Sequence, residues 1–81
     1  MQDAIIIRRS SPADSPAIHR LAELDDRAVP TGDSLLAFVG GELAVARAFN
    51  GHSVADPFRP TAELQELVAL RAIQETQRRA A

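Results

Sequence analysis

Two glycine-containing turns constrain the fold of this chain more than any other feature of its sequence. Residues 40–42 (Gly-Gly-Glu) separate the apolar runs 35–39 and 43–49, and residues 50–51 (Asn-Gly) precede the short run 53–55. Gly-Gly and Asn-Gly suit tight hairpin turns because these residues tolerate positive φ. The spacing therefore predicts three consecutive antiparallel strands, a meander.

The middle strand of this meander alternates between large and small side chains. Successive side chains of a strand point to opposite faces of the sheet. The larger residues, interrupted by Arg47, are Leu43, Val45 and Phe49, and the smaller ones are Ala44, Ala46 and Ala48. A helix could therefore lie close to the alanine face.

The chain before the meander predicts a strand and a helix. Residues 4–7 (Ala-Ile-Ile-Ile) are apolar and mostly β-branched, which predicts a buried strand. Ser11 is then a candidate N-cap, Pro12 suits the first helical position, and the charge of Asp14 favours the positive helix N-terminus. An amphipathic helix is expected from here to about Arg27.

A second helix is expected at the end of the chain. Two prolines within residues 56–60 exclude regular structure there, because proline lacks an amide hydrogen and restricts its neighbour. Thr61 is a candidate N-cap with Glu63 in the first turn, and Arg78 and Arg79 suit the negative C-terminus. The apolar residues at helical spacing are Leu64, Leu67, Val68, Leu70 and Ile73.

The length indicates one small domain, residues 1–81. The turn, cap and apolar patterns predict the α/β (α+β) class, with the order strand, helix, three-strand antiparallel meander, helix. The chain has 46% hydrophobic residues and no cysteine, so packing has to stabilise the core without disulfides. The net charge of −2 argues against nucleic-acid binding. The apolar run near the N-terminus is too short for a signal sequence or a membrane span, so a cytoplasmic protein without membrane contact is expected.

No catalytic residue and no metal site are predicted. His19 and His52 lack a second histidine, a cysteine or a carboxylate at ligand spacing, so both are expected to be solvated. Asp14 is explained as a helix cap, and the adjacent acids Asp25 and Asp26 as a helix end. No serine has a plausible histidine and acid around it, so nucleophilic catalysis is not supported.

The loop after the meander is the one candidate binding site. Asp56, Phe58 and Arg59 lie on a stiff loop at the end of a strand, and Thr61 begins the next helix. In one interpretation, Asp56 and Pro57 form an Asp-Pro turn, Phe58 lies in the core, and Arg59 pairs with an acid such as Asp56, Glu63 or Asp33. In the other, the loop is a residual contact for an anion or an acyl-CoA, made through Arg59, Thr61 and the helix N-terminus.

Three segments are similar to the GNAT superfamily of N-acetyltransferases. Residues 7–18 (IRRSSPADSPAI) resemble the first strand and first helix of that family. Residues 36–42 (LAFVGGE), with the alanine-rich strand after them, resemble its second and third strands, and residues 54–60 (VADPFRP) resemble its fourth strand. The resemblance implies about the first half of a GNAT fold, without the later strands that complete the acyl and substrate pockets.

The sequence departs from this family at the cofactor loop. In the family, a loop of the pattern R/Q-x-x-G-x-G/A holds the pyrophosphate of acetyl-CoA with its backbone amides. Arg59 could be the family arginine, but residues 60–63 contain no glycine. Pro60 lacks an amide hydrogen, and Glu63 places a negative charge where the phosphate would lie. The departure implies a domain that holds no cofactor.

Two functions are therefore expected, and a third stays open. The first is a non-catalytic GNAT-like interaction module that forms a homodimer or completes a protein partner, through an open sheet edge at residues 53–55 and an uncovered apolar strip on the last helix. The second is an N-acyltransferase that uses acetyl-CoA only as a dimer or with another subunit. The third is an unrelated α/β fold that regulates a protein partner.

Overall fold

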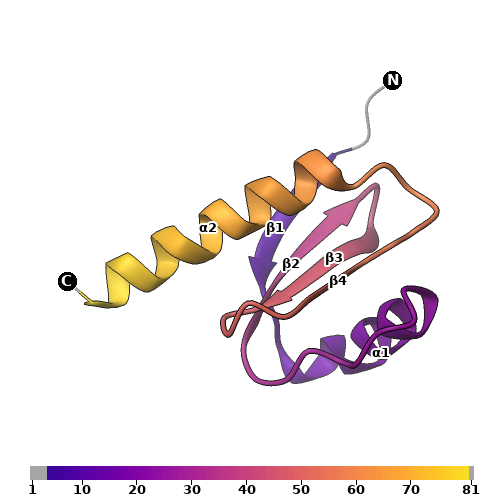
Figure 1. Cartoon of the computed structure of the whole chain (residues 1–81), viewed down its shortest axis with the longest axis horizontal. Coiled ribbons are helices and arrows are strands. Elements are labelled where there is room, and N and C mark those ends of the chain that lie inside the picture. The colour runs from indigo at the N-terminus through magenta and orange to yellow at the C-terminus, as the bar shows by residue number, and fades with distance from the viewer. Residues whose placement is uncertain (1–3, 81) are drawn as a thin grey trace.

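The fold is that of a computed structural model, in which the structure of residues 4–80 is described. The four strands form one antiparallel sheet in the order β1-β2-β3-β4, with a helix on each side (Figure 1). The predicted class and element order are confirmed. The ends of the predicted domain, residues 1–3 and 81, lie outside the described residues, as does the side chain of Arg79, for which a role at the helix end is predicted. In chain order the elements are β1 (Ile5–Arg9), the 3-10 turn η1 (Pro12–Asp14), α1 (Ser15–Leu24), β2 (Ser34–Val39), β3 (Glu42–Ala48), β4 (Ser53–Ala55) and α2 (Ala62–Ala80).

Both predicted hairpins form. The glycines that join β2 to β3 have positive φ angles of 59° and 87°. The connection from β3 to β4 is a three-residue loop, residues 49–51, because the Ala48 amide donates to the His52 carbonyl (2.8 Å). Gly51 takes a φ of 100°, and Asn50 Oδ1 accepts a hydrogen bond from the His52 amide (2.9 Å). A loop of this length with glycine at its left-handed position is a common alternative to the two-residue Asn-Gly turn.

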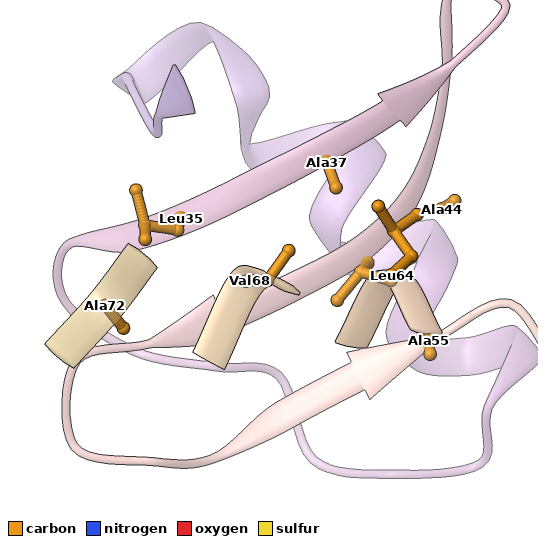
Figure 2. Close-up of a cluster of buried hydrophobic side chains, with 8 residues drawn as sticks. Leu35, Ala37, Ala44, Ala55, Leu64, Val68 and Ala72 are labelled. Atoms are coloured by element: carbon orange, nitrogen blue, oxygen red, sulfur yellow. The ribbon is translucent and has the colours of Figure 1, made fainter. Parts of the chain in front are cut away.

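Each face of the sheet is covered by one helix. α1 packs on β3 and β4, and α2 packs on β2 and β3. The core beneath α1 consists of Ile18, Leu21, Ala22, Leu36, Ala46 and Val54. The core beneath α2 consists of Leu35, Ala37, Ala44, Val45, Ala55, Leu64, Val68 and Ala72 (Figure 2). The central strands are thus buried on both faces, and the short side chain of Ala46 lies under a helix, as the alanine pattern predicts.

A β-bulge changes the predicted alternation in β3. Ala37 lies opposite Val45, but the next residue of β2, Phe38, lies opposite Leu43. Ala44 is therefore the extra residue and joins Val45 in the core beneath α2, while Leu43 packs with Phe38 on the α1 side. The predicted faces of Leu43 and Ala44 are wrong. Side chains of a strand alternate between the two faces of the sheet, and one extra residue moves the residues before it to the opposite face.

The strand predicted from the N-terminal isoleucines forms, but it is not buried. Ile5 and Ile6 remain 56% and 54% exposed, and Ile7 is partly buried against the core beneath α2. β1 is the first strand of the sheet, whereas the helices pack chiefly on β2, β3 and β4. The prediction of a buried strand is wrong because hydrophobicity does not reveal whether a helix reaches the edge of the sheet.

The first helix starts with the predicted turn at Pro12 but ends at Leu24, before the predicted end near Arg27. Asp26 adopts a left-handed φ of 53°, and its amide donates to the Glu23 carbonyl (3.2 Å). The Arg27 amide donates to the Ala22 carbonyl (3.0 Å). These bonds form a Schellman motif, which ends the helix and satisfies its last carbonyls.

Candidate functional site

The loop between β4 and α2 holds the predicted site residues in a fixed turn. The Asp56 amide donates to the Ala44 carbonyl (2.9 Å), which ties the start of the loop to β3. The Asp56 carboxylate accepts a hydrogen bond from the Phe58 amide (2.8 Å), forming an Asx turn. The turn therefore follows from the Asp-Pro sequence, as predicted.

Arg59 is held between two carboxylates. Its Nη2 lies 2.6 Å from Glu42 Oε2, and its Nε lies 3.4 Å from Asp56 Oδ2. The pairing with Asp56 confirms one of the predicted partners. Sequence analysis missed Glu42, which is 17 positions away and reaches Arg59 only because β3 begins beside the end of β4. Within this cluster of one guanidinium and two carboxylates, negative charge exceeds positive charge by one.

The other two predicted residues, Phe58 and Thr61, lie in different environments. Phe58 is 81% exposed, so its predicted place in the core is wrong. The Asx turn that binds its amide keeps Phe58 in a loop outside both helix–sheet interfaces. Thr61 is buried, and its Oγ1 accepts a hydrogen bond from Gln65 Nε2 (2.9 Å).

The structure brings three of the four predicted residues together in a polar pocket of about 220 Å³ that is lined by Asp56, Arg59 and Thr61. Asp25 and Arg27 also line this pocket. The pocket thus contains two aspartates and two arginines, and Glu42 also binds one of these arginines. Its positive charges are already balanced by protein carboxylates, so the pocket offers an anion no surplus positive charge.

The outer edge of β4 is capped by the residues that follow α1. The Ala55 amide donates to Asp25 Oδ2 (3.0 Å), and Arg27 Nη1 donates to the Ser53 carbonyl (3.2 Å). Both of these backbone groups face away from β3, because it is the residues at 52, 54 and 56 that bond to β3. The prediction of an open edge at Ser53–Ala55 is therefore corrected: β4 is an edge strand, but α1 packs against it and its loop occupies these outward groups.

A contact between Ser15 and His19 is not predicted by the sequence analysis, although their i,i+4 spacing on a helix could have indicated it. His19 Nδ1 lies 3.3 Å from Ser15 Oγ and 2.9 Å from the Ser15 carbonyl oxygen. A carbonyl only accepts hydrogen bonds, so Nδ1 carries the proton and cannot take one from the hydroxyl. His52 is also in contact with backbone, since its Nε2 lies 2.7 Å from the Ala28 carbonyl.

The second predicted interaction surface lies on α2. Leu67, Leu70 and Ile73 are 45%, 51% and 54% exposed, which confirms an uncovered apolar strip on this helix. Near its C-terminus, Arg78 Nη1 lies 3.9 Å from Glu75 Oε1. The strip is therefore accessible to another molecule along the middle of α2.

Comparison with known proteins gave no relative: no family model matches the sequence, and neither the curated proteins nor the solved structures contain a match. The similarity to the GNAT superfamily stays a prediction. Within residues 4–80, no three histidine or acidic side chains gather where they could bind a metal ion. No helix in this part of the chain combines the length and apolar character needed to cross a membrane.

Proposed function

We propose that this domain is a non-catalytic interaction module that forms a homodimer by antiparallel pairing of two β1 strands. The observation that carries the proposal is the uncovered outer edge of β1, on which Ile5 and Ile6 are more than half exposed. Unpaired strand edges are templates for association with another chain. Large exposed apolar side chains on such an edge favour its burial.

The hydrogen bonds of β1 define which backbone groups remain available. The Ala4 carbonyl accepts from Gly40, and the Ser10 amide donates to Ser34, so the even-numbered residues of this strand bond to β2. The N–H and C=O groups of Ile5 and Ile7 therefore point outward, and within residues 4–80 no hydrogen bond reaches them. The outward carbonyl of Arg9 accepts a hydrogen bond from Arg8 Nη1 (3.0 Å).

A second copy of this chain is a chemically suitable occupant of the edge. Antiparallel pairing with the two-fold axis at Ile6 places Ile6 opposite its own copy and Ile5 opposite Ile7 of the copy. The outward groups of Ile5 and Ile7 then form hydrogen-bonded pairs, because they lie two residues apart. The same register keeps Arg8 and Arg9 of the two chains at opposite ends of the ribbon, which avoids repulsion between like charges.

β1 is a better edge for this purpose than β4. The outward amide of Ala55 and carbonyl of Ser53 are occupied by Asp25 and Arg27, and β4 is only three residues long. β1 has five residues and a more apolar surface. Since stable interfaces bury about 1,200–2,000 Å² in total, a dimer held mainly by one strand pair should be weak.

Replacing Ile6 with lysine is expected to convert the dimer to a monomer. An edge lysine is a common natural device against strand pairing, and in this register the two lysines would face each other across the axis. Sedimentation equilibrium over a concentration series should give a weight-average mass that rises toward twice the monomer mass for the wild type and stays constant for Ile6→Lys.

Leu70→Lys is the matched control, because it places the same charge at a site of similar exposure on α2. We expect this variant to dimerise like the wild type. A wild type that is monomeric throughout the series would refute self-association. Dimerisation that is lost in Leu70→Lys and kept in Ile6→Lys would move the interface to the apolar strip of α2.

The acyltransferase alternative has a separate test. If the domain is non-catalytic, acetyl-CoA at millimolar concentration should leave its melting temperature unchanged. A ligand present at 100 times its dissociation constant would instead stabilise the folded state by about 2.7 kcal/mol, a readily detected shift. A saturable shift that Arg59→Gln abolishes would support acyl-CoA binding at the β4–α2 loop and contradict our proposal.

A further inference from the structure

We infer that a groove between α1 and the β2–β3 hairpin binds a small organic carboxylate with an apolar body. The groove is on the α1 side of the sheet and has a volume of about 380 Å³. This volume is within the range of about 300–1,000 Å³ that is typical of small-molecule pockets. The inference does not depend on the proposed dimer.

The walls of the groove are mainly apolar. Leu21 and Leu24 of α1 form one wall, and Phe38 and Leu43 of the hairpin form the other. Leu24 is 50% exposed, although it lies next to the core of the domain. The groove exists because α1 packs on β3 and β4 and leaves the side of the sheet nearer to β1 uncovered. An apolar ligand body would cover surface that the protein leaves in contact with water.

Arg20 supplies the positive charge of the groove. It lines the groove and makes no hydrogen bond or ion pair with any described side chain. Of its neighbours on α1 at i±3 and i±4, only Glu23 is acidic, and no ion pair joins Glu23 to Arg20. Arg20 is exposed, so its guanidinium is free to bind a ligand carboxylate through two parallel hydrogen bonds.

The other charges near the groove would orient such a ligand. Glu42 and Asp56 also line the groove, and both are bound to Arg59 in a cluster with a surplus negative charge. Arg8 is bound to Asp14 (2.8 Å) and lies over the Phe38 ring (4.8 Å), so its charge is already compensated. A ligand carboxylate is therefore attracted to Arg20 and repelled by Glu42 and Asp56.

The test uses the full ¹⁵N-labelled chain with 3-phenylpropanoate as the probe and the neutral 3-phenylpropanamide as its matched control. We expect saturable shifts of the amide signals of Arg20, Leu24 and Leu43, with a dissociation constant of about 1 mM for a ligand of this size. Loss of the charge-assisted contact should weaken binding about tenfold, both for the amide ligand and for Arg20→Gln with the carboxylate. Arg71→Gln, which removes an arginine from the exposed surface of α2, should bind like the wild type.

Each other result overturns the inference. Linear, non-saturable shifts would mean that the groove does not bind the probe. Equal affinity for the carboxylate and the amide would remove the role of Arg20. Equal weakening by Arg20→Gln and Arg71→Gln would show a general charge effect. The same titration of Ile6→Lys separates the two proposals, because a monomeric variant should still bind the probe at the groove.

Discussion

Replacing Leu36 with alanine is expected to destabilise the domain by about 3 kcal/mol, since truncation of a fully buried leucine removes apolar burial and leaves a cavity. Leu36 is on the central strand β2, is 0% exposed, and packs beneath α1 with Ala46 and Val54. The total stability of a small domain is about 5–15 kcal/mol, so this single change removes a large part of it. Urea unfolding followed by circular dichroism at fixed protein concentration measures the loss.

Ile6→Ala is the control for this prediction, because it also shortens a large aliphatic residue in a strand. Ile6 is 54% exposed on β1, so the expected change in the free energy of unfolding is below about 1 kcal/mol at concentrations where the protein is monomeric. Equal destabilisation by the two substitutions would contradict the placement of β1 outside the helix-covered part of the sheet.

This contrast shows where sequence patterns succeed and where they fail. The helices and hairpins were predictable because caps, glycine turns and apolar spacing act over a few residues, as at Ser11 and Gly51. Burial was not predictable for Ile5 and Ile6, because it depends on which strands the helices cover. The isoleucine run and the buried strand β2 have similar local composition, and only the tertiary arrangement distinguishes them.

The bulge in β3 is a second limit of the same kind. Alternation placed Leu43 and Val45 on one face, but the extra residue Ala44 reverses the order at the start of the strand. Nothing in the alternating sequence marks this position, because alanine is small enough to fit on either face. The bulge is nonetheless what places Leu43 beside Phe38 in the groove.

The candidate site was predicted in part. The Asp56–Arg59 pair is a local i,i+3 interaction and could be read from the sequence. Glu42, Asp25 and Arg27 could not be predicted as members of this region, because strand pairing and helix packing bring them there from distant parts of the chain. The bonds made by Asp25 and Arg27 also explain why the open edge of the sheet is at β1 and not at β4, where the sequence analysis predicted it.

Asp14→Ala is expected to cost about 2–3 kcal/mol, since it removes a helix cap and leaves Arg8 without its partner. The Asp14 carboxylate accepts two hydrogen bonds from the Arg8 guanidinium (2.8 and 2.9 Å) and one from the Ser11 amide (2.8 Å). The side chain of Asp14 is only 11% exposed, whereas that of Arg8 is 46% exposed and can be hydrated after the change. This exposure keeps the expected cost below that of a fully buried ion pair. Thermal unfolding at neutral pH should show a decrease of about 4–8 °C for each kcal/mol lost.

The pH dependence separates the charge of Asp14 from its shape. The hydrogen bonds from Arg8, followed by the bond from the Ser11 amide, lower the pKa of the Asp14 carboxyl well below its ordinary value. A lowered pKa in the folded state means that this group stabilises the fold fully above the unfolded-state pKa of about 3.9 and loses that contribution as the pH falls further. Asp14→Asn keeps the size of the side chain and lacks the titration, so its deficit relative to the wild type should be largest at neutral pH and should shrink below about pH 4. A deficit that stays constant down to pH 2 would mean that packing, and not the ion pair with Arg8, accounts for the contribution of Asp14.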